Sequence, residues 1–354
     1  MKMETIRDLS HAARDWLRKV RKAGRELFMI DHAIAAAMKL PVVTALGAVC
    51  RAPRGSRTKI LREAIRSIRR PAPPRTAEVC EINSLADFNS GYARLAAILG
   101  HAGKTPPPGE VEFLDSIMKR RRTWHPGTVG PSDYFFLTAF VSILAPQHVI
   151  EIGTLTGFSA GLIAAALLRQ DGTDGASWVD TIDINVECAI DRTRPTGFEI
   201  SETFPELVPL IRLHAPRDAT FVWQIAKRDE LGVIFIDADH RHPMPLLDLL
   251  RVAPCVRSEG WILLHDIQWG TIGRKAAETG QTPPWPASYG AEWLFDQWPF
   301  RKISGGNIGA VQLPHEKSAL LPFALRMMSI QFEVVRRQAR ATRRALYESL
   351  GALC

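Results

Sequence analysis

The sequence predicts an α/β protein built around a mostly parallel β-sheet with helices on both faces. From residue 132 onward, short apolar runs alternate with stretches of helical periodicity. Strands separated by helices are normally parallel, because a crossover through a helix returns the chain to the same edge of the sheet. Sheets of this kind bind ligands at the carboxyl ends of their strands, so the residues that follow each strand are where function is expected.

Each expected strand is a short, nearly continuous apolar run, which is typical of a strand buried on both faces. The expected strands are 148–152, 179–184, 210–213, 233–236, 261–264 and 308–313. The segments between them place apolar residues three or four positions apart, the spacing of a helix with one buried face. The expected helices around the strands are 133–144, 159–168, 186–192, 220–227 and 245–256.

Both ends of the chain predict helical extensions to this sheet. Residues 1–40 and 323–350 have helical spacing with basic residues on the polar face, and a further helix is expected at 110–121. The N-terminal helix could pack on its own domain, lie on an anionic membrane or bind RNA, and the C-terminal helix could pack on its neighbours, dimerise or contact a membrane; the pattern leaves these open. We expect four parts: a basic helical extension with a proline-rich linker at 1–75, a helical lead-in at 76–130, the sheet domain at 131–313 and a C-terminal amphipathic helix at 314–354.

The composition is that of a globular protein and its positive charge is unevenly placed. The 354 residues are 46% hydrophobic and 23% charged, which excludes a collagen-like or wholly disordered chain. Residues 1–75 hold 18 basic and 6 acidic residues, a net charge of +12, and the remainder has a net charge of −4. An enzyme that acts on nucleic acid more often carries positive charge around its active site. A small-molecule substrate is therefore favoured.

The cysteines and the N-terminus predict a cytoplasmic protein. The five cysteines are widely spaced and form no C-x-x-C pair, so a disulfide framework and a zinc knuckle are not expected. Charged residues recur from Lys2 onward with no apolar core segment of a secretory signal, and no apolar run is long enough to span a bilayer.

A glycine-containing turn follows the first strand. Glu151, Gly153, Gly157 and Ser159 stand at the junction with the next helix. The glycines allow a tight turn and close approach of a ligand to the backbone. The middle glycine of a dinucleotide fingerprint is replaced by Leu155, and the carboxylate of Glu151 suits a cationic ligand better than a pyrophosphate. An ordinary strand-to-helix turn is the alternative interpretation.

Acidic and imidazole side chains follow the later strands. Asp183 ends the second strand, where an acid can hold ribose hydroxyls or cap the next helix. Asp237 and His240 follow the fourth strand, and His265 and Asp266 follow the fifth. Such a density of ionisable groups at neighbouring strand ends is typical of cation binding or proton transfer.

The residues at these strand ends resemble the motifs of a known protein family. The run from Val149 to Ser159 is similar to the first motif of class I S-adenosylmethionine-dependent methyltransferases, and Asp183 matches their ribose-binding acid. The segments 236–240 and 260–266 resemble a subgroup that includes metal-dependent sugar and antibiotic O-methyltransferases. The resemblance covers about 131–313. It implies a Rossmann-like, seven-stranded, mostly parallel sheet whose last strand, 308–313, is antiparallel.

The resemblance also implies a cofactor site. In S-adenosylmethionine the donor is a sulfonium cation without phosphate, which agrees with the acid beside the loop. The residues implied to bind it are Glu151, Gly153, Thr154, Gly157, Ser159, Asp183, Asp218, Ala219 and Asp237. Glu151 would support the loop or attract the amine, and the bulky Pro216-Arg217 loop departs from the family pattern near the adenine position.

Two catalytic arrangements remain open. In the metal-dependent relatives, acids matching Asp237, His265 and Asp266 hold a divalent ion such as Mg²⁺ that lowers the pKa of the acceptor hydroxyl, and the residue matching His240 is the base. Here His265 replaces a carboxylate, which weakens a site for a hard cation. Without metal, His240 or His265 could act as the base directly. His240 could instead cap a helix or bond to Asp237, and His242 is expected at the surface.

The acceptor is the least determined part of the prediction. An aromatic stretch between Trp269 and Trp298 could line an acceptor pocket, with Trp269 or Trp285 as candidates, or pack in the core. We expect a small molecule, such as a sugar or secondary metabolite, and a homo-oligomer is conceivable. The alternatives are an RNA or protein acceptor docked by the basic N-terminal segment, and a non-catalytic S-adenosylmethionine-binding scaffold.

Overall fold

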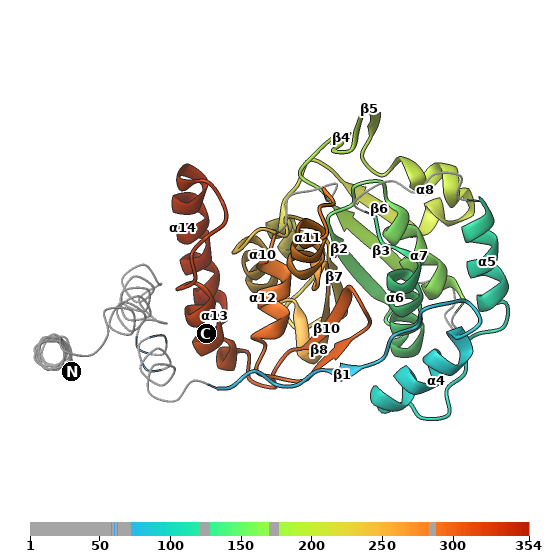
Figure 1. The fold of residues 1–354 in the computed structure, drawn as a ribbon, viewed down its shortest axis with the longest axis horizontal. Helices are drawn as coiled ribbons and strands as arrows, with labels where there is room; N and C mark the ends of the chain where they lie inside the picture. Colours follow the sequence, from blue (N-terminus) through green and yellow to red (C-terminus); the bar gives the residue numbers. More distant parts are fainter. Residues whose placement is uncertain are drawn as a thin grey trace, which may run out of the picture.

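The computed structural model describes residues 58, 60, 62, 72–120, 128–169, 177–282 and 288–353. The helix expected at 1–40 and the candidate pocket residue Trp285 lie outside these residues. In the described part, a central sheet lies between two groups of helices (Figure 1). The α/β class predicted from the alternation of strands and helices is confirmed.

The central sheet has eight strands in the order β1-β9-β10-β8-β7-β2-β3-β6. Five neighbouring strands, β8, β7, β2, β3 and β6, are parallel, and β10 is antiparallel to β8 as predicted. The implied count of seven is exceeded by the two-residue strand β1, which pairs with β9 at one edge. The bounds are β1 Glu78–Val79, β2 His148–Ile152, β3 Trp178–Ile182, β6 Ile211–His214, β7 Leu231–Ile236, β8 Val256–His265, β9 Lys302–Ser304 and β10 Ile308–Gln312.

The sheet is buried on both faces because its central strands are apolar at consecutive positions. In β7, Ile234 and Ile236 join one hydrophobic cluster, whereas Val233 and Phe235 join the cluster on the opposite face. Successive side chains of a strand point to opposite faces, so a continuous apolar run fills two cores at once. This is why the strands could be recognised as uninterrupted runs.

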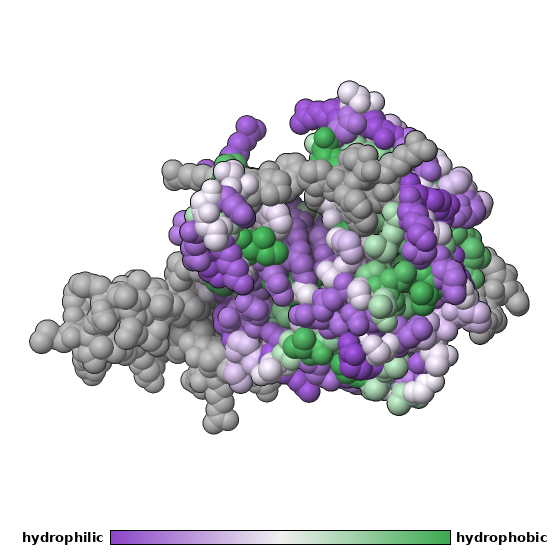
Figure 2. Space-filling view, turned by 45° about the vertical axis from the view of Figure 1, so that its right-hand side comes forward, coloured by the Kyte–Doolittle hydropathy of each residue, from purple (hydrophilic) through white to green (hydrophobic). Residues whose placement is uncertain are grey.

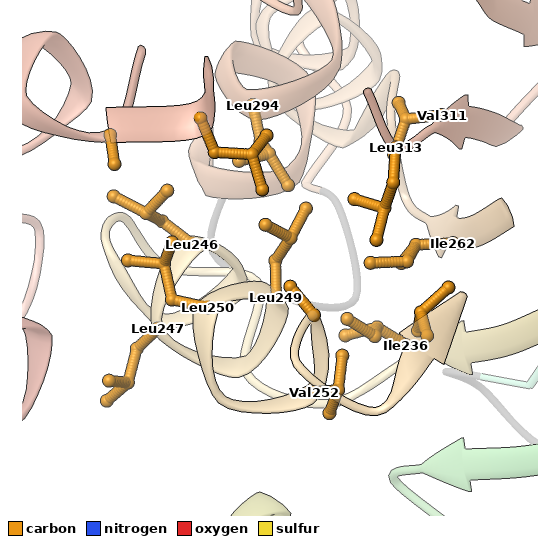
Figure 3. Packing of buried hydrophobic residues seen from close by; sticks show 14 of the residues in the cluster. Ile236, Leu246, Leu247, Leu249, Leu250, Val252, Ile262, Leu294, Val311 and Leu313 are labelled. Carbon is orange, nitrogen blue, oxygen red and sulfur yellow. The ribbon is translucent and has the colours of Figure 1, made fainter. Parts of the chain in front are cut away.

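Different helices cover the two faces. One face carries α4 (Phe88–Ile98), α5 (Glu110–Arg120), α6 (Pro131–Leu144) and α7 (Phe158–Leu168). The other carries α10 (Met244–Val252), α12 (Gly290–Asp296), α13 (Leu320–Met327) and α14 (Arg336–Ala352). Figure 3 shows the leucines of α10 against Ile236, Ile262 and Val311 of the sheet. In the view of Figure 2, hydrophilic side chains cover most of the described surface, with hydrophobic patches between them.

Three helix predictions are wrong in part. Residues 186–192 form a hairpin, β4 (Glu187–Cys188) and β5 (Asp191–Pro195), and the helix that follows it is α8 (Phe198–Thr203). Residues 220–227 form only a 3₁₀ turn and the four-residue helix α9 (Val222–Ile225). The single helix expected at 323–350 is divided into α13 and α14. No helix of the described residues is long and apolar enough to cross a membrane.

The strand order reverses between β2 and β7. From β2 the chain continues through β3 to β6 on one side, and it then returns to place β7 and β8 on the other side of β2. The loop after β2 leads to α7 on one face of the sheet and the loop after β7 leads to α10 on the other, and such a switch point is where sheets of this kind bind ligands. The predicted site residues Gly153, Thr154 and Gly157 stand in the first of these loops, Asp237 and His240 stand in the second, and Ser159 lies in the first turn of α7.

A buried carboxylate ties three strands together on the far side of β2. Asp180 of β3 accepts hydrogen bonds from His148 Nε2 at 2.7 Å, Trp178 Nε1 at 2.8 Å and His214 Nε2 at 2.6 Å. Burial opposes its charged form, but these three donors outweigh burial and lower the pKa of Asp180 to about 2. Asp180 belongs to β3 and its two histidine partners belong to β2 and β6, so the carboxylate stabilises the pairing of these strands.

Replacing Asp180 with alanine should lower the free energy of unfolding by about 1–3 kcal/mol at neutral pH, because the buried His148 ring loses its acceptor. A carboxyl whose pKa falls on folding stabilises the fold above its unfolded pKa, near 3.8, and loses that contribution as the pH falls toward 2. Urea unfolding at a series of pH values checks this. A gap between wild type and variant that does not narrow in acid would contradict the assignment.

Candidate active site

Gly153 brings the ends of β2 and β7 into contact. Its backbone has a φ of +99°, and a Cβ at this position would lie 2.0 Å from the carbonyl oxygen of Asp237. The amide of Asp237 also donates to the carbonyl of Ile152 at 2.8 Å. A side chain at 153 would collide with backbone, so only glycine lets these two strand ends close together. The loop after β2 is therefore adjacent to Asp237, as the predicted site requires.

Asp183 organises the turn after β2. Its Oδ2 accepts the backbone N–H groups of Thr154 and Leu155, each at 3.0 Å, and its Oδ1 accepts the N–H of Asn185 at 2.8 Å. The carbonyl of Asp183 accepts the amide of Arg217 at 2.7 Å, which joins the loop after β6 to the same point. The side-chain amide of Asn185 also donates to Oδ1 at 3.1 Å, so four donors occupy the roughly four acceptor positions of this carboxylate.

Several residues predicted to bind the cofactor are buried and support the loop between β2 and α7. Glu151 is fully buried and accepts the hydroxyl of Thr181 at 2.5 Å, and Thr181 is 2.6 Å from the hydroxyl of Thr154. Burial raises the pKa of Glu151 to about 8, against the hydrogen bonds that favour its charged form. Gly157 ends the turn with a φ of +85°, and Ser159 is buried in the first turn of α7. The position of Glu151 agrees with support of the loop.

The predicted adenine neighbours lie after β6. Asp218 caps the following 3₁₀ turn by accepting the N–H of Thr220 at 3.1 Å, and it forms an ion pair with Arg251 of α10 at 3.2 Å. Ala219 is buried against the core on the same face. The backbone hydrogen bond from Arg217 to Asp183 connects this turn to the end of β3.

The acids and imidazoles after β7 and β8 form one cluster. His240 Nε2 lies 3.2 Å from Asp266 Oδ2 and 3.4 Å from Asp237 Oδ1. His265 Nδ1 lies 3.1 Å from the same Asp237 oxygen and 3.6 Å from Asp266 Oδ1. His265 is buried, whereas the His240 side chain is 23% exposed and is the imidazole that a substrate can reach.

The cluster has strongly coupled charges. Burial opposes the charged form of His240, but the hydrogen bond to Asp237 and the charge of Asp266 outweigh it and raise the pKa of His240. Burial likewise opposes charge on His265, and the carboxylates of Asp237 and Asp266 raise the pKa of His265 well above its usual range. The pKa of Asp237 is lowered, because the two imidazoles overcome the effect of burial.

Asp133 is a member of this cluster that the sequence did not indicate. It stands in the first turn of α6, and its Oδ2 lies 3.4 Å from His265 Nε2. Its Oδ1 is buried and has no hydrogen-bond partner among the described residues. Asp133 is separated from His265 by 132 positions, so no local pattern could have connected them.

The donor set does not fit a divalent metal as it stands. No group of three or more histidine, cysteine, aspartate or glutamate side chains in the described part of the chain has an arrangement that could hold one. Both nitrogens of His265 face carboxylates, and Asp266 Oδ1 accepts the amide of Asn307 at 2.6 Å. The predicted ligands Asp237, His265 and Asp266 are brought together, but their donor atoms are paired with one another.

His242 is buried, which corrects the expectation that it lies at the surface. Its Nε2 donates to the carbonyl of Met327 at 3.1 Å, and its backbone amide donates to the carboxylate of Glu333. Burial lowers the pKa of His242 to about 4, although the Met327 carbonyl favours the charged form. This histidine therefore anchors the loop that carries His240 to the segment between α13 and α14.

Most of the described aromatic stretch packs inside the protein. Trp298 is fully buried against Phe323, Phe295 is buried in the same cluster, and Trp293 stacks on Tyr289 with ring centroids 5.3 Å apart. Trp269 is partly exposed at the start of α11 (Trp269–Glu278), just after Asp266. Its backbone amide donates to the carbonyl of Asp266 at 3.2 Å, so this candidate pocket residue lies beside the cluster.

Comparison with known families gives one match. Residues 150–267, which hold the glycine turn, Asp183 and the imidazole cluster, match the model of a methyltransferase domain. No curated protein matches the chain.

Solved structures of similar shape include O-methyltransferases. One is the O-methyltransferase from Bacillus cereus in complex with SAH, with 17% identity, coverage of 65% of this chain and 100% of that chain, and a TM-score of 0.38. Another is the O-methyltransferase TomG from Streptomyces achromogenes in complex with SAM, with 15% identity, 65% and 99% coverage, and a TM-score of 0.38. A third is a putative caffeoyl-CoA O-methyltransferase from Staphylococcus aureus, with 15% identity, 63% and 98% coverage, and a TM-score of 0.38.

The fold and the family match agree with the resemblance seen in the motifs. The matched segment spans the switch in strand order, where the two diverging loops lie. Within the α/β fold, residues 150–267 of this chain are therefore similar to a methyltransferase domain.

Proposed function

We propose that this protein transfers a methyl group from S-adenosylmethionine to a hydroxyl oxygen of a small molecule, such as a sugar or secondary metabolite, with His240 as the general base. The observation that carries the proposal is the position of His240. Its ring is partly exposed, is held by two carboxylates and follows the strand that Gly153 contacts. A hydroxyl group must lose its proton when it attacks a methyl carbon, and an imidazole suits that task near neutral pH.

Asp237 and Asp266 determine which nitrogen of His240 takes the proton. Both carboxylates face Nε2, so the neutral ring carries its hydrogen on Nε2 and keeps the lone pair of Nδ1 free. The same carboxylates stabilise the imidazolium that forms when Nδ1 accepts the proton. This is the role that an aspartate plays beside the histidine of a catalytic triad.

The loop between β2 and α7 is the proposed cofactor site. When bound, S-adenosylmethionine supplies an electrophilic methyl group on a positively charged sulfur. Gly153 allows close approach to the backbone, and Asp183 fixes the turn through Oδ2, while ribose hydroxyls would replace the Asn185 donors on its Oδ1. The protein's contribution to the transfer is mainly to align the acceptor oxygen and the methyl group.

Replacing Asp183 with alanine should weaken S-adenosylmethionine binding by roughly 10- to 100-fold, because hydrogen bonds to a charged group contribute about 1.5–3 kcal/mol. Isothermal titration calorimetry measures this directly. Asp115→Ala is a suitable control, since Asp115 lies on α5 and pairs only with Lys119 among the described contacts. Equal affinity in wild type and Asp183→Ala would remove the ribose assignment.

A screen of cofactor consumption tests the acceptor class. The full chain is incubated with S-adenosylmethionine and with sugars, phenols, acids or RNA, with and without divalent metal. Turnover with hydroxyl-bearing small molecules supports the proposal. Turnover with RNA alone, lost at moderate salt, would instead indicate docking through phosphate contacts.

A further inference from the structure

His265 is surrounded by three carboxylates that come from three different parts of the fold. Asp133 belongs to α6, Asp237 follows β7 and Asp266 follows β8. Their oxygens lie 3.4, 3.1 and 3.6 Å from the nitrogens of the ring. The first two distances are within hydrogen-bonding range, and they involve opposite nitrogens of the imidazole.

A ring in this position has no lone pair for a metal ion. An ionised carboxylate only accepts hydrogen bonds, so a ring that serves Asp133 and Asp237 at once carries N–H on both nitrogens. Such a ring is an imidazolium. Three carboxylates packed together without a cation would repel one another strongly in a buried site.

Asp133 completes the arrangement from outside the segment matched by the family model. Its side chain is buried, and Gly130 and Gly306 lie close to it, since a Cβ at these positions would be 3.6 and 3.8 Å from its two carboxylate oxygens. Without Asp133, the N–H at Nε2 of His265 would lose the carboxylate oxygen that accepts its hydrogen bond.

We propose that the His265 imidazolium, held by Asp133, Asp237 and Asp266, takes the place of the divalent metal ion at this site, so that the methyltransferase works without metal. The inference rests on the proposed function for its catalytic meaning. The fixed cation neutralises the carboxylates that orient His240. Its charge also opposes a second positive charge on His240, which keeps the base available for the acceptor proton.

The first test measures metal binding, not turnover. Mn²⁺ is titrated into the full chain and the free ion is followed by electron paramagnetic resonance, with S-adenosylmethionine binding measured in parallel by calorimetry. We expect no specific Mn²⁺ binding by the wild type. Binding that the Asp237→Asn variant abolishes would overturn the inference.

A charge swap gives the complementary test. The double variant Asp133→Asn with His265→Glu exchanges the imidazolium for a carboxylate and removes its second anionic partner. We expect it to bind Mn²⁺ at least about tenfold more tightly than the wild type, because hard divalent ions prefer oxygen ligands. Asp133→Asn with His265→Gln is the matched control, and it should not bind. No gain over this control in a folded double variant would count against the inference.

Nuclear magnetic resonance of the His265 ring in the wild type keeps the test decisive if the variants do not fold. A doubly protonated ring through neutral pH supports the inference, and a neutral ring overturns it. Failure of the proposed function has a different signature: S-adenosylmethionine does not bind, or no acceptor is methylated, while the imidazolium persists and Mn²⁺ stays free.

Discussion

The variant His240→Ala should lose methyl transfer by roughly 10²- to 10⁴-fold, the range that a positioned general base supplies. The loss is expected in kcat, because the base acts on the acceptor proton in the transition state. Affinity for S-adenosylmethionine should change little, since His240 is not among the residues proposed to bind it. Turnover under saturating substrate and calorimetry of cofactor binding measure the two effects separately.

The same assignment fixes the direction of the pH dependence. A base works in its neutral form, so kcat/KM should rise as the pH increases through the raised pKa of His240. In Asp266→Asn the rise should move to lower pH, because the charge that favours the imidazolium is removed. A pH profile of both proteins checks the shift. Wild-type kcat in His240→Ala would show that another group is the base.

The control for His240→Ala is His315→Ala. The His315 side chain is highly exposed and pairs with Glu316 at 3.7 Å, whereas the hydrogen bond from Ser258 goes to the backbone carbonyl of His315, which an alanine keeps. The His315→Ala variant also loses an imidazole ring, but we expect no effect of this loss on turnover. Equal loss in both variants would indicate a general effect of the substitution on the protein and would contradict a specific role for His240.

The second large effect is expected for Gly153→Ala. The added Cβ would lie 2.0 Å from the Asp237 carbonyl oxygen and 3.0 Å from Ala238 Cα, so backbone must move to admit it. Overpacking of this kind costs about 1–3 kcal/mol. The left-handed backbone conformation costs a further 1–2 kcal/mol or so for an alanine. We expect lower stability and severe loss of S-adenosylmethionine binding, measured by urea unfolding and calorimetry.

Gly100→Ala separates the two contributions. Gly100 has a similar φ of +84°, but a Cβ there would meet nothing within 4 Å. This control has a comparable backbone penalty without the collision, and it lies after α4, away from the strand ends. The difference between the variants therefore reports the contact between β2 and β7. Cofactor affinity that is equal in Gly153→Ala and wild type would contradict the proposed closeness of the loop to the ligand.

The central strands, such as β7, were predictable because they are apolar at consecutive positions, and this pattern can be seen without knowledge of the partner strand. The hairpin at 187–195 was missed because a short stretch with a few apolar residues gives no period that distinguishes strand from helix. The division between α13 and α14 also has a tertiary cause. Glu333 lies between them and accepts the backbone amides of His242 and Tyr289, two groups that are remote from it in sequence.

The sequence by itself determined the class of fold, the glycine turn and the acids and imidazoles at the strand ends, because each of these can be recognised from residues that are neighbours in the sequence. The tertiary structure decided how those groups pair. The position of Asp133 against His265, the burial of His242 and the contact of Gly153 with Asp237 all join residues that are distant along the chain. Hydrogen-bond partners and charge states depend on such contacts, and only the folded chain brings them within a few ångströms.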